Sequence, residues 1–398
     1  MRRFAVLSLL LCLGSTHAAE PVARVRVTFD RNGVDTLQAQ GMADVAAGRA
    51  ITVDDPARIA SISKLVTTLG VMRLVEQGKL SLDADVSKQL GFTLRNPAFP
   101  DRKITLRMLL SHTSSLTDGA GYWNVPLGSA ITSITNDPKA WDDAHAPGTY
   151  FRYTNLNFPL VAQLMGRATG ERFDLLMRRL VLAPLQLDAC FNWSGCSDAA
   201  VARAVVLYDA NGAVEKDDLH GKRPACPVIV AEGDDCDLSR ATPGSNGALF
   251  SPQGGLRISV RDLAKIGRLL LNDGTLDGVR ILKPATVRLL ATSVWTWNGS
   301  NGEIGEEDEP NTGGVFCSYG LAMHMLARGD GTKCRDDLFG DGRKRIGHSG
   351  SAYSLLSGLW IDRERGTGVA YFATGVANDS SSAHSAFSAV EEQGAVGW

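Results

Sequence analysis

The sequence predicts an α/β (α+β) fold, in which an antiparallel sheet flanked by helices carries an inserted all-helical lobe. Both ends of the 398-residue chain contain short runs rich in β-forming residues, whereas the middle shows helical spacing broken by Gly- and Pro-rich loops. The hydrophobic content of 44% is sufficient for a large core. We therefore expect a signal peptide at residues 1–18, an α/β lobe of residues 19–85 and 247–398, and a helical lobe of residues 86–246. We expect the functional site between the two lobes.

The first elements after the N-terminal segment are a hairpin and a helix. Apolar and polar residues alternate over Val25–Phe29, and Asp30–Gly33 has the composition of a turn. The next segment, Ile62–Val75, has helical periodicity, and Gly78 is a typical residue to end such a helix. The apolar positions that share one face of this helix are Leu65, Leu69, Met72 and Val75.

Helical spacing recurs through the middle of the chain and once after it. The patterns of the middle segment are short, as expected for helices interrupted by Gly- and Pro-rich loops. They cover Leu106–Leu110, Phe158–Ala168 and Phe173–Leu180. A further amphipathic helix is predicted over Ser259–Leu271, with its apolar face formed by Leu263, Ile266, Leu269 and Leu270.

The last part of the chain returns to strand-like sequence. Its polar turns separate short runs rich in β-forming residues, and Arg363–Gly366 is predicted to be the turn of one hairpin. A closing helix is predicted from about Ser382 to Glu392. The expected strands are Tyr319–Met325, Leu355–Asp362 and Gly368–Thr374.

The N-terminus has the three-part layout of a secretory signal peptide. Arg2 and Arg3 precede the apolar run Phe4–Leu13, and small residues stand before Ala19. The competing interpretation is a short buried helix. We expect export to the periplasm, and the mature chain contains no apolar stretch long enough to span a bilayer.

The charge of the chain narrows the classes of partner. A formal net charge of −2 and a pI near 6.4 argue against a nucleic-acid partner, which calls for a basic face. We expect a monomer that acts on a small molecule.

Six cysteines remain after the signal peptide, and an even number in an exported chain indicates disulfides. About 15 pairings are possible, but the cysteines form three local couples. We predict the bonds Cys190–Cys196, Cys226–Cys236 and Cys317–Cys334. Zinc binding is the alternative, but no histidine-rich cluster accompanies the cysteines. Four of the seven histidines lack metal-ligand spacing and are interpreted as structural or surface residues: His112, His145, His220 and His324. We expect neither a metal nor a cofactor.

The first chemical motif pairs a serine with a lysine at the start of the first predicted helix. Lys64 lies one helical turn after Ser61, so both side chains project from the same face. A serine at a helix N-terminus lies in a field that favours a developing oxyanion. Burial disfavours the charged form of a nearby lysine, which can then act as a base. About one such match is expected by chance in a chain of this length, but here it occurs once and at a helix start.

The second motif is Tyr-x-Asn, which occurs at Tyr153 to Asn155 and at Tyr122 to Asn124. A tyrosine beside a protonated lysine can relay protons, and the asparagine offers a donor and an acceptor to a substrate amide. We favour Tyr153 and Asn155 because a turn precedes them and a helical pattern follows. Tyr122 and Trp123 are expected to form a wall of the substrate pocket, the alternative being plain surface.

The third motif, His348-Ser349-Gly350, is predicted to lie on a strand edge. Gly350 lets a substrate backbone approach closely, and the amides of Ser351 and Ser61 together form a candidate oxyanion hole. Alone, the motif is better explained by a half-buried strand histidine.

Together these motifs give the chain a recognisable pattern. It resembles the serine β-lactamase and penicillin-binding protein family, in the branch of class C β-lactamases, D-alanyl-D-alanine carboxypeptidases, D-aminopeptidases and family VIII-type esterases. The resemblance covers nearly the whole mature chain and implies a β-lactamase/transpeptidase-like fold. Connecting segments resemble the family as well: Arg58–Ala60, Gly78–Asp83, Leu109–Ser114, Gly254–Leu256 and Asp262–Ala264.

The resemblance implies roles for the motif residues. Ser61 corresponds to the acylated nucleophile, Lys64 and Tyr153 to the general acid/base pair, and Asn155 to the substrate anchor. His348 and Ser349 occupy the strand position that recognises a substrate carboxylate or tunes the tyrosine.

The chain departs from the family pattern at four positions. Histidine at position 348 stands where class C β-lactamases usually carry lysine, which puts efficient β-lactam hydrolysis in doubt. Thr154 and Ser349 keep the hydroxyl of the usual residues, and Ser115 replaces a glycine and is expected to reshape its loop.

Three functions compete on this basis. The first is a serine hydrolase that opens β-lactams or cleaves D-Ala-type amides through a Ser61 acyl-enzyme. The second is an esterase for small acyl esters, with which His348 and the aromatic residues Tyr122, Trp123 and Trp141 are compatible. The third is a penicillin-binding sensor that is acylated at Ser61 and hardly turns over.

Overall fold

The computed structural model describes residues 20–305, 313–377, 382 and 384–398. The predicted signal peptide, residues 1–18, lies outside this range. Within the described residues, no helix combines the length and apolar character needed to cross a membrane.

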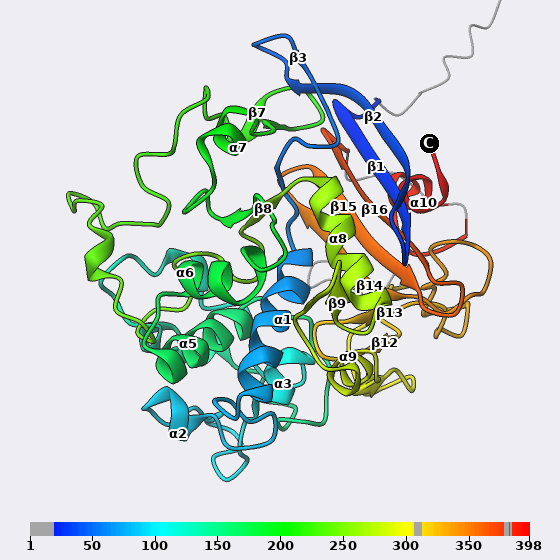
Figure 1. Ribbon diagram of the computed structural model, residues 1–398. Coiled ribbons are helices and arrows are strands. Elements are labelled where there is room, and N and C mark those ends of the chain that lie inside the picture. The colour runs from blue at the N-terminus through cyan, green and yellow to red at the C-terminus, as the bar shows by residue number, and fades with distance from the viewer. Residues whose placement is uncertain (1–19, 306–312, 378–381, 383) are drawn as a thin grey trace, which may run out of the picture.

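A nine-stranded sheet is the largest sheet of the fold, in the order β11-β12-β13-β14-β15-β16-β1-β2-β3 (Figure 1). Neighbouring strands pair antiparallel, as the sequence predicted. The N-terminal hairpin pairs with the C-terminal strands, and Ala23 lies opposite Thr374. The strands are β1 (Ala23–Asp30), β2 (Val34–Asp44), β3 (Arg49–Ala50), β11 (Trp295–Thr296), β12 (Ser318–Tyr319), β13 (His324–Met325), β14 (Ile346–Ala352), β15 (Leu355–Asp362) and β16 (Thr367–Thr374).

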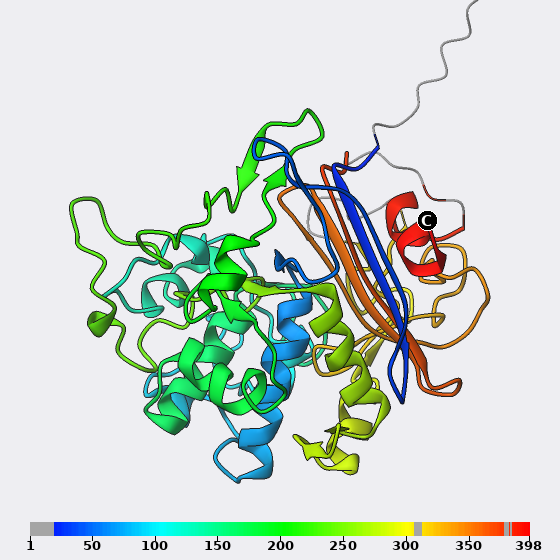
Figure 2. The same cartoon turned by 45° about the horizontal axis from the view of Figure 1, so that its top comes forward.

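Helices cover both faces of this sheet. Helices α1 (Ile62–Glu76) and α8 (Val260–Leu271) pack against one face, and α10 (Ala389–Val396) packs against the other (Figure 2). Helix α1 is buried on nearly all sides, so it is a central helix rather than a surface one. The closing helix was predicted to begin near residue 382, which is wrong. A capping box between Ser388 and Glu391 fixes its start at Ala389.

The middle of the chain forms the helices on the other side of α1 (Figure 1). It also contains short strands: Cys190–Phe191 pairs with the later strand β8 (Leu256–Ile258), and Leu207–Tyr208 pairs with Val214–Lys216. The helices are α2 (Ser87–Leu90), α3 (Leu106–Leu110), α4 (Thr132–Thr135), α5 (Asn157–Thr169), α6 (Phe173–Met177), the π-helical turn Arg178–Leu182 and α7 (Asp198–Ala202), with 3₁₀ turns at Tyr122–Asn124, Pro138–Ala140 and Leu238–Arg240. A further helix, α9 (Pro284–Leu290), follows α8 later in the chain.

A three-stranded sheet and two short hairpins complete the described structure. Strands β4 (Ala57–Arg58), β8 (Leu256–Ile258) and β5 (Cys190–Phe191) form a three-stranded sheet in the order β4-β8-β5. Two hairpins consist of β6 (Leu207–Tyr208) with β7 (Val214–Lys216), and of β9 (Thr275–Leu276) with β10 (Val279–Arg280). The division of the chain into lobes at residues 85 and 247 stays a prediction.

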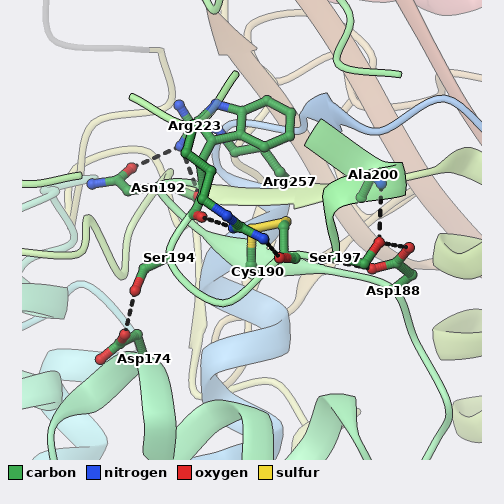
Figure 3. The surroundings of a disulfide bond; sticks show 12 residues. Asp174, Asp188, Cys190, Asn192, Ser194, Ser197, Ala200, Arg223 and Arg257 are labelled. Carbon is green, nitrogen blue, oxygen red and sulfur yellow. Dashed lines mark hydrogen bonds between the residues drawn. A yellow bond between two sulfur atoms is a disulfide. The ribbon is translucent and has the colours of Figure 1, made fainter. Parts of the chain in front are cut away.

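The three predicted disulfides are confirmed: Cys190–Cys196, Cys226–Cys236 and Cys317–Cys334. Figure 3 shows the first of them beside Ser197, which caps α7 by accepting from the amide of Ala200. In the same view, the hydroxyl of Ser194 donates to Asp174 of α6.

Candidate active site

Ser61 stands at the N-terminal end of α1, directly after strand β4. The preceding residue, Ala60, has a left-handed backbone with φ 47°, which turns the chain sharply from strand to helix. Lys64 is fully buried one turn later. Its Nζ donates to Ser61 Oγ (2.8 Å), to Asn155 Oδ1 (2.8 Å) and to the carbonyl of Gln253 (3.3 Å). Two predicted motifs thus meet at one ammonium group.

A buried carboxylate orients Asn155. Asp118 Oδ2 accepts from the backbone N–H of Asn155 (2.9 Å) and from its side-chain Nδ2 (3.0 Å), while Oδ1 accepts from the amide of Leu156 (2.8 Å). Burial raises the pKa of Asp118, and these three hydrogen bonds partly oppose the rise. Because Nδ2 is held by Asp118, the amide oxygen of Asn155 is left facing Lys64.

Tyr153 is held between two rings that come from distant parts of the chain. Its ring stacks on His112 with centroids 4.4 Å apart and on Phe316 with centroids 4.8 Å apart. The Nζ of Lys64 lies 4.7 Å from the centroid of Tyr153. Two stacked neighbours occupy both faces of the phenol, so its ring plane is fixed beside the lysine.

His112 is itself fixed by the loop that carries Tyr153. Its Nδ1 accepts from the backbone N–H of Thr154 (3.0 Å), which places the ring proton of the neutral form on Nε2. Burial, followed by the charge of Lys64, holds the pKa of His112 well below its usual range. His112 is therefore a neutral platform for Tyr153 at physiological pH.

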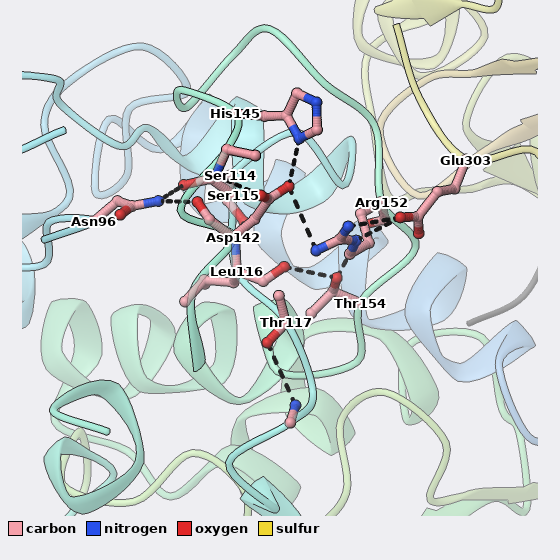
Figure 4. Close-up of polar contacts among 12 residues, drawn as sticks. Asn96, Ser114, Ser115, Leu116, Thr117, Asp142, His145, Arg152, Thr154 and Glu303 are labelled. Atoms are coloured by element: carbon pink, nitrogen blue, oxygen red, sulfur yellow. Dashed lines mark hydrogen bonds and ion pairs between the residues drawn. The ribbon is translucent and has the colours of Figure 1, made fainter. Parts of the chain in front are cut away.

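The residues on either side of Tyr153 are tied to the surrounding loops (Figure 4). Arg152 donates to Glu303 through Nε (2.9 Å) and Nη2 (2.6 Å). The hydroxyl of Thr154 donates to the carbonyl of Leu116 (2.9 Å). These contacts anchor the strand-like segment on both sides of the phenol.

His348 lies in β14 and is almost fully buried. Its Nδ1 donates to the carbonyl of Ser349 (2.5 Å), so Nε2 accepts from the hydroxyl of Tyr319 (2.7 Å). Burial, followed by the charge of Lys64, holds the pKa of His348 well below its usual range. At neutral pH the imidazole is uncharged, and both ring nitrogens are engaged in hydrogen bonds, with Ser349 and with Tyr319.

The strand β14 runs directly past the start of α1 at Gly350. A Cβ atom on Gly350 would lie 2.5 Å from the carbonyl oxygen of Ile59 and 3.1 Å from the amide nitrogen of Ser61. That this glycine also lets a substrate backbone approach stays a prediction. Its missing side chain makes room for the protein's own backbone at Ile59 and Ser61.

A cavity of about 1000 Å³ opens over these residues. Its lining includes Ser61, Tyr153 and Asn155, together with Tyr122 and Trp123, which were predicted as a pocket wall. Tyr122 is buried, and burial raises its pKa, whereas Trp123 is 54% exposed. Ser351 also lines the cavity, but His348, Ser349 and Gly350 are not among its described lining residues.

A model of the Beta-lactamase family matches residues 22–391 of this sequence, which is almost the whole described chain. The chain belongs to the Beta-lactamase family. This is a family of serine hydrolases, and its fold is the one the sequence predicted.

Individual curated relatives share no more than about a third of their residues with this chain, and only over part of its length. The chain is 30% identical over 171 residues to esterase EstB of Burkholderia gladioli, covering 38% of this chain and 42% of that protein. It is 28% identical over 261 residues to penicillin-binding protein 4 of Amycolatopsis lactamdurans, covering 64% and 61%. The chain thus spans less than two thirds of the length of either protein. A solved structure, an octameric penicillin-binding protein homologue from Pyrococcus abyssi, matches 89% of this chain and 70% of its own at a TM-score of 0.64 and 21% identity.

The loop beside Asn96 contains Ser115, which is expected from the resemblance to replace a glycine. This residue adopts φ 65°, the left-handed conformation that glycine adopts without strain. Its hydroxyl accepts from Nδ2 of Asn96 (3.0 Å), which also donates to the carbonyl of Asp142 (Figure 4). Ser115 thus combines a left-handed backbone with a side-chain hydrogen bond that glycine could not make, and the predicted change of the loop stays a prediction.

Three residues of the site escaped the sequence analysis: Asp118, Phe316 and Tyr319. None belongs to a short motif, and each reaches the site through the tertiary fold. His112 was interpreted as a structural or surface residue. It is buried, and its ring stacks on Tyr153 and so positions the phenol. Within the described part of the chain, no group of three or more His, Cys, Asp or Glu side chains is arranged to hold a metal.

Proposed function

We propose that this protein is a serine hydrolase that forms an acyl-enzyme on Ser61, with β-lactams or D-Ala-type amides as substrates. The observation that carries the proposal is the position of Lys64 Nζ, 2.8 Å from both Ser61 Oγ and Asn155 Oδ1. A nucleophile, a proton-transfer group and an amide-recognition group are thereby joined at one point of an open cavity.

In the proposed reaction, Ser61 Oγ bonds to the acyl carbon and gives its proton to the pair formed by Lys64 and Tyr153. The pair returns this proton to the leaving nitrogen as the acyl C–N bond breaks. A water molecule then attacks the ester, its proton passes through the same pair, and Ser61 Oγ regains a hydrogen. The amides of Ser61 and Ser351 would stabilise the oxyanion in both steps.

The fixed surroundings of Tyr153 support its role as proton carrier. A ring held between His112 and Phe316 cannot swing away from the lysine, so little reorganisation is needed during transfer. The cation of Lys64 beside the ring favours the phenolate form at the moment when the proton leaves.

Hydrolysis of small acyl esters is the second candidate, and the state of His348 favours it. A neutral imidazole engaged with Tyr319 and Ser349 offers no fixed positive charge to a substrate carboxylate at this strand. An ester without a carboxylate on its leaving group needs no such charge. The similarity to an esterase over part of the chain agrees with this alternative.

The test is the intact mass of the protein over time with a penicillin and, separately, with a carbapenem. A transient adduct with accumulating hydrolysed drug is expected, and Ser61→Ala should form none. A long-lived adduct without turnover would instead assign the penicillin-binding sensor. Absence of any adduct would overturn the β-lactam proposal, and rates on p-nitrophenyl esters and D-amino-acid amides would then decide between the remaining substrates.

We also propose that the protein is exported to the periplasm after removal of residues 1–18. Three disulfides support this, because such bonds persist in oxidising compartments. The N-terminal mass of the protein purified from a periplasmic fraction tests it. A mature chain that begins at Ala19 is expected, and a chain retained with Met1 in the cytoplasm would contradict it.

A further inference from the structure

Two arginines lie directly opposite each other beneath the cavity. Arg58 on β4 pairs in register with Arg257 on β8, and both are at least nine-tenths buried. Both line the cavity that contains Ser61. Like charges on directly opposed positions repel, and buried charges are normally paired. The pair therefore needs two negative groups.

The protein supplies one of them. Asp217 accepts from Nε (3.2 Å) and Nη2 (2.9 Å) of Arg257, and Trp193 Nε1 also donates to it (3.0 Å). Both carboxylate oxygens are thereby engaged, and Asp217 is 9% exposed. This carboxylate neutralises Arg257.

Arg58 has only neutral acceptors in the described structure. Its Nη1 donates to the carbonyl of Gly254 (2.9 Å), and Nη2 lies 3.5 Å from Asn192 Oδ1, which also accepts from Arg257 at 2.7 Å (Figure 3). Its buried Nε has no hydrogen-bond partner among the described residues. Burial, followed by the charge of Arg257, lowers the pKa of Arg58 to about 10, so the guanidinium stays charged at neutral pH.

Other acidic residues line the cavity but do not neutralise Arg58. Glu215 is exposed to water, and Asp218 lies 3.2 Å from the imidazole of His220. Asp118 is engaged with Asn155 and Leu156. No carboxylate of the described chain lies within ion-pair distance of Arg58, whereas a cation buried without a counter-charge is costly.

The hairpin turn after β14 places an aromatic ring over this cation. Tyr353 and Ser354 connect β14 to β15 with φ of 54° and 50°, values that favour Gly and Asn at both positions. The ring centroid of Tyr353 lies 5.1 Å from Arg58 and 5.4 Å from the Nζ of Lys216. A two-residue hairpin of this type requires a positive φ at both positions, and the turn holds the ring of Tyr353 at the cavity wall.

The position along β14 identifies the part of the substrate concerned. Gly350 is the residue that abuts Ser61, so His348 and Tyr353 lie on opposite sides of the nucleophile along the strand. Tyr153 is near His348, with ring centroids 6.1 Å apart. If Tyr153 protonates the leaving group, that group lies towards His348, and the acyl group extends towards Tyr353 and Arg58.

We propose that Arg58, covered by Tyr353, forms a subsite for a carboxylate at the far end of the substrate's acyl group. This inference rests on the proposed acyl-enzyme function, because the subsite is defined relative to Ser61. Asp217 acts on Arg58 only from beyond ion-pair distance, and the bound carboxylate would supply the direct counter-charge. Shielding by Tyr353 would strengthen the charged hydrogen bonds.

The test compares p-nitrophenyl esters of succinic, glutaric and adipic acids with the same esters whose far carboxylate is capped as a methyl ester. Spontaneous hydrolysis is subtracted with Ser61→Ala. We expect at least one free carboxylate to raise kcat/KM about 10- to 100-fold over its capped partner. Equal rates for every pair would overturn the subsite while leaving the proposed function intact.

Variants separate the guanidinium from general charge effects. Arg58→Gln should abolish the preference for the free carboxylate, and Arg58→Lys should keep part of it. Arg288→Gln, an exposed arginine on α9, is the matched control and should keep the whole preference. A preference that survives Arg58→Gln would contradict the proposal.

A binding measurement on the wild-type protein covers the cases in which the variants misfold or no ester reacts. Glutarate should bind or compete in the millimolar range or better, whereas neutral glutaramide should not. Failure of both esters and β-lactams to acylate Ser61 would refute the proposed function, and glutarate binding would still report on Arg58. Equal binding of glutarate and glutaramide would overturn the subsite.

Discussion

Asp118 accepts hydrogen bonds from both nitrogens of Asn155 and thereby determines which end of its amide faces Lys64. The backbone contact fixes the position of the residue, and the side-chain contact fixes the rotation of the amide. An asparagine without this partner could present either oxygen or nitrogen to the lysine. The orientation of the Asn155 amide, whose oxygen accepts from Lys64, therefore depends on Asp118, 37 positions earlier in the chain.

Replacing Asp118 with asparagine should slow acylation. Whichever way the new amide turns, its NH2 group would face a donor, either those of Asn155 or the amide of Leu156, so the segment that holds the oxygen of Asn155 towards Lys64 would shift. A small misplacement of this kind can cost about 10²-fold in rate. Acylation rate from single-turnover mass measurements is the readout, with kcat and KM determined separately.

Asp209→Asn is a suitable control for this change. Asp209 also accepts backbone amides, those of Asn211 and Ala213, but in an exposed turn of the β6–β7 hairpin. It should leave acylation unchanged. Equal acylation rates in wild type and Asp118→Asn would show that Asn155 is oriented without the carboxylate.

Gly350→Ala should impair both stability and activity. The added methyl would lie 2.5 Å from the carbonyl oxygen of Ile59, so β14 and the start of α1 must separate. Overpacking of this kind costs about 1–3 kcal/mol, and here the displaced backbone includes Ser61. Urea denaturation and kcat/KM measure the two effects. Gly33→Ala, where no atom lies within 4 Å of the added Cβ, should change neither.

Loss of the Cys317–Cys334 disulfide should reach the site through Phe316. This bond closes a sequence separation of 17 residues, and removing it should cost about 3 kcal/mol of unfolding free energy by loop entropy. Phe316 is the chain neighbour of Cys317 and stacks on Tyr153, so kcat should fall as well. Thermal unfolding and kcat of the Cys317→Ala/Cys334→Ala variant test this.

The Cys190–Cys196 bond provides the comparison, because neither cysteine lines the cavity or is adjacent to an aromatic neighbour of Tyr153. Its double alanine variant should lose stability with a smaller change in kcat. A kcat loss of the same size in both variants would mean that the effect is general loosening rather than movement of Phe316.

Acid should destabilise the protein below about pH 6.5 through its buried histidines. Burial holds the pKa values of His112 and His348 well below the usual range and lowers that of His324 to about 4. The unfolded chain takes up protons on these residues as the pH falls through 6.5, while the folded chain does not. Each histidine should therefore remove up to about 1.4 kcal/mol per pH unit, until the folded pKa is reached.

The variant His324→Gln should reduce this slope by about one third between pH 6.5 and 5. His220→Gln, at a side chain that is 74% exposed, should leave the slope unchanged. Unfolding free energies from urea titrations at a series of pH values provide the measurement. A slope that is unaltered by His324→Gln would show that this histidine is protonated equally in both states.

The sequence revealed those features whose cause is local. The N-terminal hairpin, the helix after Ser61 and the strand 355–362 follow from periodicity and turn residues within each segment. The disulfide pairing was predictable because the partners are close in sequence. The start of the closing helix was not predicted correctly, because a single capping box between Ser388 and Glu391 determines it.

The features that the sequence concealed are those assembled from distant segments. Tyr153 meets His112 and Phe316 only after the sheet and the helices have packed together, and no spacing rule connects the three. The same holds for Asp118. The motif drew attention to the absent side chain of Gly350, but its close approach to the backbone at Ile59 could not be read from the sequence.

The pairing of β1 with β16 has a consequence for how this chain is made. Residue 23 finds its partner at residue 374, so the first strands synthesised must wait for nearly the last before the sheet can close. Until then the hairpin β1–β2 carries an open edge that can recruit other chains. Such long-range pairing slows folding. Loss of the C-terminal residues that contain β16 would leave this edge permanently exposed, so truncated products should aggregate rather than persist as smaller folded proteins.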